Sequence, residues 1–203
     1  MVDVIETFKL NEKNYVDEIH KKTQIVLGNT LSIGMDHFEW WSKKVNGKFK
    51  GTAAFTIAQD GQVYNHYDPK YYSKFIKLYN WDERSIPIVL ENEGWLIKDF
   101  KKNKLRNWCG DEYSKNEETA IYIKWRGKFR WAPYSEEQIN SLAELCGDLC
   151  EKFDIPLICA THNTKIDDIS EKQGIYSRSN YSVNYLDVSP AFNFEEFKKQ
   201  IKR

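Results

Sequence analysis

The chain has 203 residues, with 30 Lys and Arg against 30 Asp and Glu, and a mean hydropathy of −0.68. This length is enough for one folded domain with a substantial core. Because the charges balance, no polybasic field indicates a nucleic-acid partner. No apolar run approaches the roughly 20 residues of a membrane span, so we expect no membrane partner either.

Cysteine usage and the start of the chain bear on its compartment. Four cysteines in a chain of this length do not make a disulfide framework. The first ten residues, MVDVIETFKL, lack the basic start and apolar run of a signal peptide. We therefore expect a soluble, cytoplasmic protein. Seven Trp and twelve Tyr indicate either a large mixed core or a cleft lined with rings.

The first half of the chain predicts short strands and short helices in alternation. Apolar or β-branched runs ending in turn residues predict strands over 4–10, 24–27 and 85–90. Helical spacing predicts helices over 14–22, 36–44 and 70–78. Asn46-Gly47 predicts a turn, and Asp60-Gly61 predicts a hairpin joining 54–58 to 62–67. Pro87 places the third strand near a sheet edge.

The second half begins with a charged segment without period, 99–118, which predicts a loop insertion. Arg126-Gly127-Lys128 predicts a second hairpin. Ser135 with Gln138 forms a capping-box pattern before a long amphipathic helix. A strand over 157–160 then presents His162, and a last helix follows Asn193. The pattern predicts an α/β fold, a mixed central β-sheet flanked by helices, in a single domain spanning 1–203.

Four stretches in this order carry a family likeness. They are the strand QIVLGNT from Gln24, the hairpin AFTI with DGQVY from Ala54, the strand IVLENEG from Ile88, and the long helix with the segments THN and DVSP that follow it. The chain resembles the zinc-dependent N-acetylmuramoyl-L-alanine amidases of the peptidoglycan-recognition type, which include AmpD-like enzymes and phage endolysins. The resemblance covers most of the chain, from about residue 25 to 197, and implies the same fold.

The resemblance also implies a zinc site, which this chain matches only in part. The family holds zinc with two histidines and an Asp or Cys, and adds an acidic residue and a lysine for catalysis. The second histidine matches His162 and the aspartate matches Asp187. The first histidine falls on Gly28, the acidic residue on Val89 and the lysine on Tyr185.

Replacements for the missing groups are conceivable within the chain. His37, or His66 beyond the hairpin, could move toward His162 as a third zinc ligand, and Glu91 or Glu93 could replace the acid. The alternative is that both histidines are ordinary surface or hydrogen-bonded residues and both glutamates belong to a solvated strand end. His162 and Asp187 could themselves be a backbone-bonded histidine and a helix cap.

Ligand contacts are expected around these positions. The polar loop Ser177-Arg178-Ser179-Asn180-Tyr181 lies between His162 and Asp187 in the chain, and Arg178 suits a carboxylate or phosphate. With Asn29 at the end of the first family strand and Tyr185, these residues form the predicted cleft: His162, Asp187, Asn29, Arg178, Asn180, Tyr181 and Tyr185.

Three functions remain open at this stage. The departures at Gly28, Val89 and Tyr185 favour a protein, of phage origin if endolysin-like, that binds a muropeptide or another polar ligand without zinc catalysis. An active amidase with a rearranged zinc site, using His162, Asp187 and Glu91, is the first alternative. A structural module of a phage particle is the second.

Overall fold

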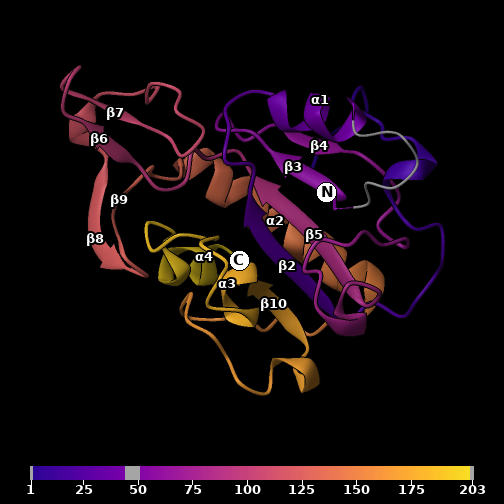
Figure 1. Ribbon diagram of the computed structural model, residues 1–203. Coiled ribbons are helices and arrows are strands. Elements are labelled where there is room, and N and C mark those ends of the chain that lie inside the picture. Colours follow the sequence, from indigo (N-terminus) through magenta and orange to yellow (C-terminus); the bar gives the residue numbers. More distant parts are fainter. Residues whose placement is uncertain (1, 44–50, 202–203) are drawn as a thin grey trace.

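The computed structural model describes residues 2–43 and 51–201, which form a six-stranded mixed sheet (Figure 1). Its strand order is β1-β4-β3-β5-β2-β10. The strands are β1 (Val4–Ile5), β2 (Gln24–Asn29), β3 (Phe55–Ile57), β4 (Val63–Asn65), β5 (Ser85–Leu90) and β10 (Gly174–Ser177). The pairs β3–β5, β5–β2 and β2–β10 are parallel, so their carboxyl ends share one edge of the sheet. The predicted α/β fold is confirmed.

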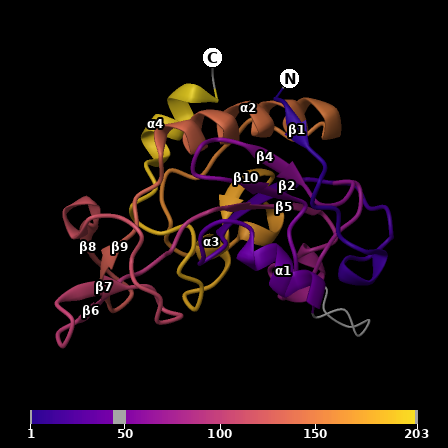
Figure 2. The same ribbon diagram turned by 90° about the horizontal axis from the view of Figure 1, so that it is seen from above.

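Helices cover both faces of the sheet. The long helix α2 (Glu136–Phe153) and α4 (Phe194–Gln200) pack on one face, and α1 (Asp36–Lys43) lies on the other (Figure 2). Every residue of β2 and β5 is therefore buried, as the apolar runs of buried parallel strands require. None of the described helices is both long and apolar enough to cross a membrane.

The helix predicted from Ser135 is confirmed with its cap. The Ser135 side chain accepts from the Gln138 backbone N–H, and the Gln138 side chain accepts from the Ser135 N–H. The Gln138 amide group then donates to the carbonyls of Ile57 and Glu91. One capping residue thus fixes the start of α2 against the ends of β3 and β5.

The prediction that Pro87 marks a sheet edge was wrong, because β5 lies between β3 and β2. The Pro87 carbonyl accepts from Ala54 N–H, so the proline nitrogen faces the same side. The β3 ladder begins only one residue later, at the Phe55–Ile88 pair. The missing N–H therefore falls just outside the ladder and costs no strand hydrogen bond.

Several predicted elements differ in the structure. Segment 14–22 contains only the end of a short 3₁₀ turn (Glu12–Asn14), and 70–78 forms turns instead of a helix. Segment 157–160 contributes one bridge, Cys159 to Ile175, instead of a strand. Helix α1 and both hairpins are confirmed, whereas the Asn46-Gly47 turn lies outside the described residues.

Segment 99–118, predicted to be a loop insertion, is part of a small lobe that spans residues 95–132 and contains strands. The lobe contains two antiparallel hairpins, β6 (Ile97–Asp99) with β7 (Lys104–Arg106) and β8 (Ile121–Trp125) with β9 (Lys128–Trp131). It projects to one side of the main sheet (Figures 1 and 2). A separate apolar cluster holds it together: Leu96, Leu105, Tyr113, Ala120 and Ala132. That the whole chain is one domain stays a prediction.

Candidate functional site: a cleft at the carboxyl ends of the parallel strands

A cavity of about 530 Å³ lies at the carboxyl ends of β2 and β5. In open α/β sheets this edge is the usual place for a ligand. Strand ends, α1, the turns after residue 70 and the lobe all contribute to its wall. The side chains central to its chemistry are Asn29, His37, Trp40, Phe75, Lys77, Trp108, Asp111 and Arg178.

An ion pair between Arg178 and Asp187 lies beside this cavity. The Arg178 Nη1 atom is 3.1 Å from Asp187 Oδ2, and the Asp187 side chain is only 7% exposed. The guanidinium lies between two rings, 4.7 Å from the centroid of Phe75 and 4.1 Å from that of Tyr185. A cation is therefore already held on the one carboxylate that the family resemblance assigns to zinc.

Gly28 lies directly against this pair. A Cβ atom built on Gly28 would lie 2.6 Å from Asp187 Oδ2 and 2.6 Å from the Phe75 ring, and 3.1 Å from Arg178. Contacts below 3.0 Å require the neighbours to move. The space that a ligating histidine would need at this position is thus filled by a carboxylate, a phenyl ring and a guanidinium stem.

Asn29 is the polar residue that joins the strand end to the rest of the site. Its backbone N–H donates to Asp187 Oδ2 (3.1 Å), and its side-chain oxygen accepts from the Tyr134 hydroxyl (2.8 Å). The Tyr134 hydroxyl also accepts from the Ser189 N–H, and burial raises the pKa of Tyr134 to about 12. Asn29 lines the cavity, and its Nδ2 atom has no hydrogen-bond partner among the described residues.

His37 lines the cavity and also belongs to a buried cluster with Thr56 and His66. Thr56 Oγ1 lies 2.8 Å from His37 Nε2 and 2.8 Å from His66 Nε2, while His66 Nδ1 donates to the Phe8 carbonyl. Burial lowers the pKa of His37 to about 3 and that of His66 to about 4. Both rings are therefore neutral and hydrogen-bonded, as the alternative interpretation of these histidines predicted.

The two glutamates proposed as replacement acids are also engaged. The Glu91 carboxylate accepts from the backbone N–H groups of Gly34 and Gln59, which ties β5 to the loop before α1 and to the β3–β4 turn. Glu93 accepts from the backbone N–H and hydroxyl of Ser114, and burial raises its pKa. Glu91 does not line the cavity, so it acts as a structural link between loops.

His162 lies on the surface and its ring contacts a neighbour in sequence. Its Nδ1 atom is 2.7 Å from Thr164 Oγ1 and accepts from the Thr164 N–H at 3.2 Å. The His162 side chain is exposed and does not line the cavity. The structure therefore places the His162 ring outside the cleft to which the sequence assigned it.

The predicted loop 177–181 is instead the end of β10 and a short helix, α3 (Arg178–Tyr181). Asn180 is fully buried and donates to the carbonyls of His162 and Thr164. Tyr181 is buried on the far side, where its hydroxyl donates to Gln24. These two residues stabilise the fold and do not face the cavity. The structure thus groups four of the predicted cleft residues: Asn29, Arg178, Tyr185 and Asp187.

The residues present do not fit the family's zinc site. Position 28 has no side chain, Asp187 is ion-paired to Arg178, and the His37 ring is bonded to Thr56. Within residues 2–43 and 51–201, no three His, Cys, Asp or Glu side chains lie together as a metal would need. Two ligands without a third are a poor basis for zinc affinity.

Sequence reasoning missed part of the cleft wall. Phe75 packs under Arg178 from a segment predicted to be helical, and Trp108 reaches the cavity from the segment predicted to be a loop. Trp40 of α1 also lines the cavity. The high Trp content was the available signal, because a ring-lined cleft was one of its two interpretations.

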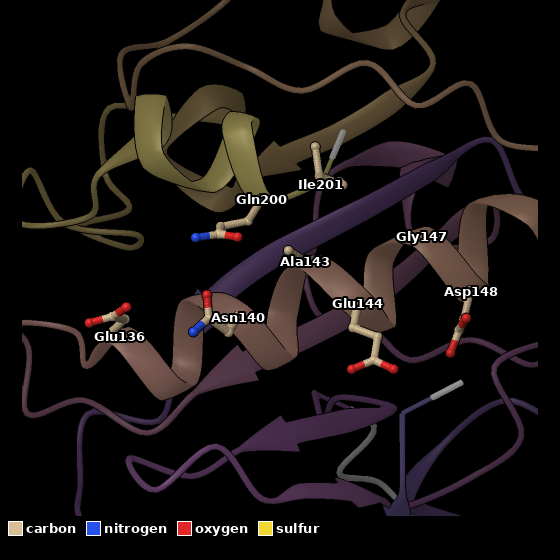
Figure 3. A pocket seen from close by; sticks show the side chains of 8 residues that line it. All are labelled: Glu136, Asn140, Ala143, Glu144, Gly147, Asp148, Gln200 and Ile201. Atoms are coloured by element: carbon tan, nitrogen blue, oxygen red, sulfur yellow. The ribbon is translucent and has the colours of Figure 1, made fainter. Parts of the chain in front are cut away.

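A second hollow, of about 480 Å³, lies between α2 and α4 (Figure 3). Figure 3 shows the side chains of Glu136, Glu144 and Asp148 along α2, with Gln200 approaching from α4. None of the predicted site residues lines it. Its lining residues come from α2 and from the end of the chain at α4, and none of them lines the cleft.

The fold and the cleft define a mixed-sheet α/β protein with a ligand site at the carboxyl ends of its parallel strands. A family model described as N-acetylmuramoyl-L-alanine amidase matches residues 20–174, and the chain belongs to this family. No curated protein sequence matches the chain.

Solved structures of low sequence identity share the fold over nearly the whole chain. The amidase LysC from Clostridium intestinale URNW is 14% identical with a TM-score of 0.56, covering 100% of this chain and 99% of its own. A mutant endolysin from Bacillus subtilis is 15% identical with a TM-score of 0.59, covering 99% of both chains. The amidase AmiD from E. coli is 12% identical with a TM-score of 0.56, covering 96% of this chain and 66% of its own.

Proposed function

We propose that this protein binds a peptidoglycan fragment, a muropeptide, in the cleft without the zinc chemistry of its family. The observation that carries the proposal is the Arg178–Asp187 ion pair at 3.1 Å, which occupies the space that a side chain at position 28 would need. A permanent cation that cannot lose its proton satisfies Asp187. The chain then has no need of a metal ion at this carboxylate.

The cavity has the mixed chemistry that a muropeptide requires. Trp40 and Trp108 offer flat apolar surfaces for a sugar ring. Lys77 offers positive charge to the carboxylates of the peptide stem, and the guanidinium of Arg178 has N–H groups beyond the one bonded to Asp187. The solved AmiD structure is a complex with anhydro-N-acetylmuramic acid-L-Ala-D-gamma-Glu-L-Lys, which supports this class of ligand for the shared fold.

The competing function is an active amidase, which family membership favours. It would require zinc on a rearranged ligand set and an acid near the scissile amide. The contacts of His37 and Glu91 with Thr56, Gly34 and Gln59 count against both requirements. A phage origin, a structural role in a phage particle and a cytoplasmic location stay predictions.

The first test combines metal content with binding and hydrolysis. The purified protein is incubated with excess zinc, desalted and measured by elemental analysis. It is then titrated calorimetrically with muramyl dipeptide and assayed for turbidity loss on purified sacculi. We expect far less than one zinc per chain, saturable binding and no turbidity loss. One zinc per chain together with lysis would overturn the proposal.

Alanine substitutions of two arginines provide the test variant and its matched control. Arg178→Ala should weaken muramyl dipeptide binding about tenfold, because it removes a charged donor from the cleft. Arg130→Ala removes a guanidinium that also lies over a tyrosine ring, 4.9 Å from the Tyr122 centroid, but outside the cavity. This control should bind as the parent does. Equal affinity of all three proteins would contradict the role of Arg178.

A further inference from the structure

The lobe and the rest of the molecule carry opposite charge. Residues 95–132 contain ten Lys and Arg against five Asp and Glu, although the whole chain has 30 of each. The rest of the chain therefore has an excess of negative charge equal to the excess of positive charge in the lobe. A charge asymmetry of this size gives one region a positive field that attracts anions.

Three of the ten lobe cations meet carboxylates: Lys98 with Glu117, Lys104 with Glu112, and Arg106 with Asp99. Of the seven without an ion pair among the described residues, Lys101, Lys102 and Lys115 lie in separate loops, and the other four lie together on one hairpin. Residues 119–135 contain no Asp or Glu. Among the residues that the structure describes, no carboxylate forms an ion pair with the four cations of the β8–β9 hairpin: Lys124, Arg126, Lys128 and Arg130. We call residues 121–131 the basic ribbon.

Each cation of the basic ribbon lies over an aromatic ring. Arg130 is 4.9 Å from the Tyr122 centroid, and the two residues are register partners across the strands. Lys124 lies 6.0 Å from the Phe129 centroid. Tyr122 and Phe129 are 58% and 54% exposed. The ribbon thus presents exposed aromatic rings, each with a positive charge over one face, repeated along two strands.

The other end of the ribbon is fixed to the main body. The Arg126 guanidinium, in the turn, donates to the carbonyls of Ser179, Ser182 and Tyr185. The turn is therefore held against α3 and the segment that follows it. It also places the ribbon next to the segment that carries Arg178 and Asp187, so one polymer could reach both.

We propose that the basic ribbon binds an anionic glycan polymer, whose sugars stack on the exposed rings while its carboxylates or phosphates meet the neighbouring cations. Sugar rings need flat apolar surfaces and their acidic groups need unpaired cations, and the ribbon supplies both at adjacent positions. The choice of a glycan over another polyanion rests on the proposed function of the cleft.

The test measures binding of polygalacturonate fragments, which carry one carboxylate per sugar, by fluorescence anisotropy at low salt. Neutral dextran of equal length and a single-stranded thymidine oligonucleotide are the comparison ligands. We expect polygalacturonate to bind, dextran not to bind, and affinity to fall with added salt. Absent polygalacturonate binding, or tighter oligonucleotide binding, would overturn the proposal.

Two variants locate the site. Tyr122→Ala with Arg130→Ala should weaken polygalacturonate binding about tenfold or more, since both a ring and a cation are lost. Lys124→Gln, a change at an exposed side chain, should weaken it by a smaller factor without affecting folding. Lys152→Ala is the control, because Lys152 lies 5.5 Å from the Phe153 ring on α2, outside the lobe. Unchanged affinity in the double variant would overturn the assignment.

The two proposals fail separately. If the cleft binds no muropeptide, Arg178→Ala and the parent give the same flat titration with muramyl dipeptide, while polygalacturonate binding is unaffected. If the ribbon binds no glycan, muramyl dipeptide binding remains intact in the Tyr122→Ala, Arg130→Ala variant.

Discussion

Two clusters of buried polar side chains lie near the same end of the sheet, and their polar groups are satisfied in opposite ways. Arg178 and Asp187 are both charged and neutralise each other at 3.1 Å. His37, Thr56 and His66 are all neutral and share a chain of hydrogen bonds. The first cluster lies beside the cavity, and the second includes His37 of α1, which lines another part of the cavity wall.

The difference shows how a metal-site fold can persist without the family's ligand set. A buried carboxylate needs a cation, and Arg178 supplies one that stays charged at all working pH values. Buried histidines need hydrogen-bond partners, and the Thr56 hydroxyl accepts from one ring and donates to the other. The Asp187 carboxylate and the Nε2 atoms of both histidines are thus satisfied within the chain, whereas the buried His37 Nδ1 atom has no hydrogen-bond partner among the described residues.

The largest expected effect concerns the histidine cluster and pH. The pKa values of His37 and His66 are lowered by burial to about 3 and about 4, from 6.5. At pH values between the folded-state pKa and the unfolded-state pKa of 6.5, the unfolded chain binds more protons than the folded chain. The stabilisation is therefore complete above pH 6.5 and is lost as the pH falls. Lowering the pH from 7 to 5 should cost about 2 kcal/mol of unfolding free energy for each histidine.

Urea denaturation at the two pH values measures this loss. His37→Gln removes one of the two titrating rings and should reduce the pH-dependent loss by about half. Thr56→Val, which removes the hydroxyl but keeps the shape, should lower stability at both pH values. An identical pH dependence in the parent and His37→Gln would show that His37 does not contribute to it.

A smaller effect is expected at the charged cluster, where Gly28 leaves no space. Gly28→Ala should lower the free energy of unfolding by about 2 kcal/mol, because its Cβ overlaps Asp187 and Phe75. Gly147→Ala, in α2 with nothing within 4 Å of its Cβ, should instead raise it by about 1 kcal/mol through helix propensity. If Gly28→Ala were neutral, Asp187 and Phe75 would be able to move enough to accept a Cβ atom at this strand end.

Sequence patterns predicted the parts of the fold whose stability is local or periodic. The apolar run of β2, the capping box of α2 and the Asp60-Gly61 hairpin depend on neighbouring residues, so each could be predicted from its own segment. The prediction from Pro87 was wrong, because a proline is excluded from a strand only where its nitrogen faces a paired neighbour. Whether the Pro87 nitrogen faces one depends on where β3 begins, which the sequence around Pro87 does not show.

The candidate site was predictable only where the strand ends fix it. Asn29 ends β2, Arg178 follows β10, and Asp187 was identified by the order of the family's motifs. The structure brings these three residues together. Asn180 and Tyr181, next to Arg178, point elsewhere because a single turn of helix turns each side chain in a different direction. The Phe75 and Trp108 contacts depend on tertiary packing of two irregular segments, which no periodic pattern encodes.

The smallest expected effect separates charge from stacking at the charged cluster. Arg178→Lys keeps the positive charge beside Asp187 but loses the planar guanidinium held between Phe75 and Tyr185. We expect a loss of about 1 kcal/mol in urea denaturation, since the carboxylate stays paired while the ring contacts weaken. Arg178→Ala should cost about 3 kcal/mol, because it leaves Asp187 buried without a cation. Equal losses in the two variants would mean that the fork geometry of the guanidinium, and not its charge, satisfies Asp187. In that case no compact cation, a metal ion included, would substitute for Arg178 at this carboxylate.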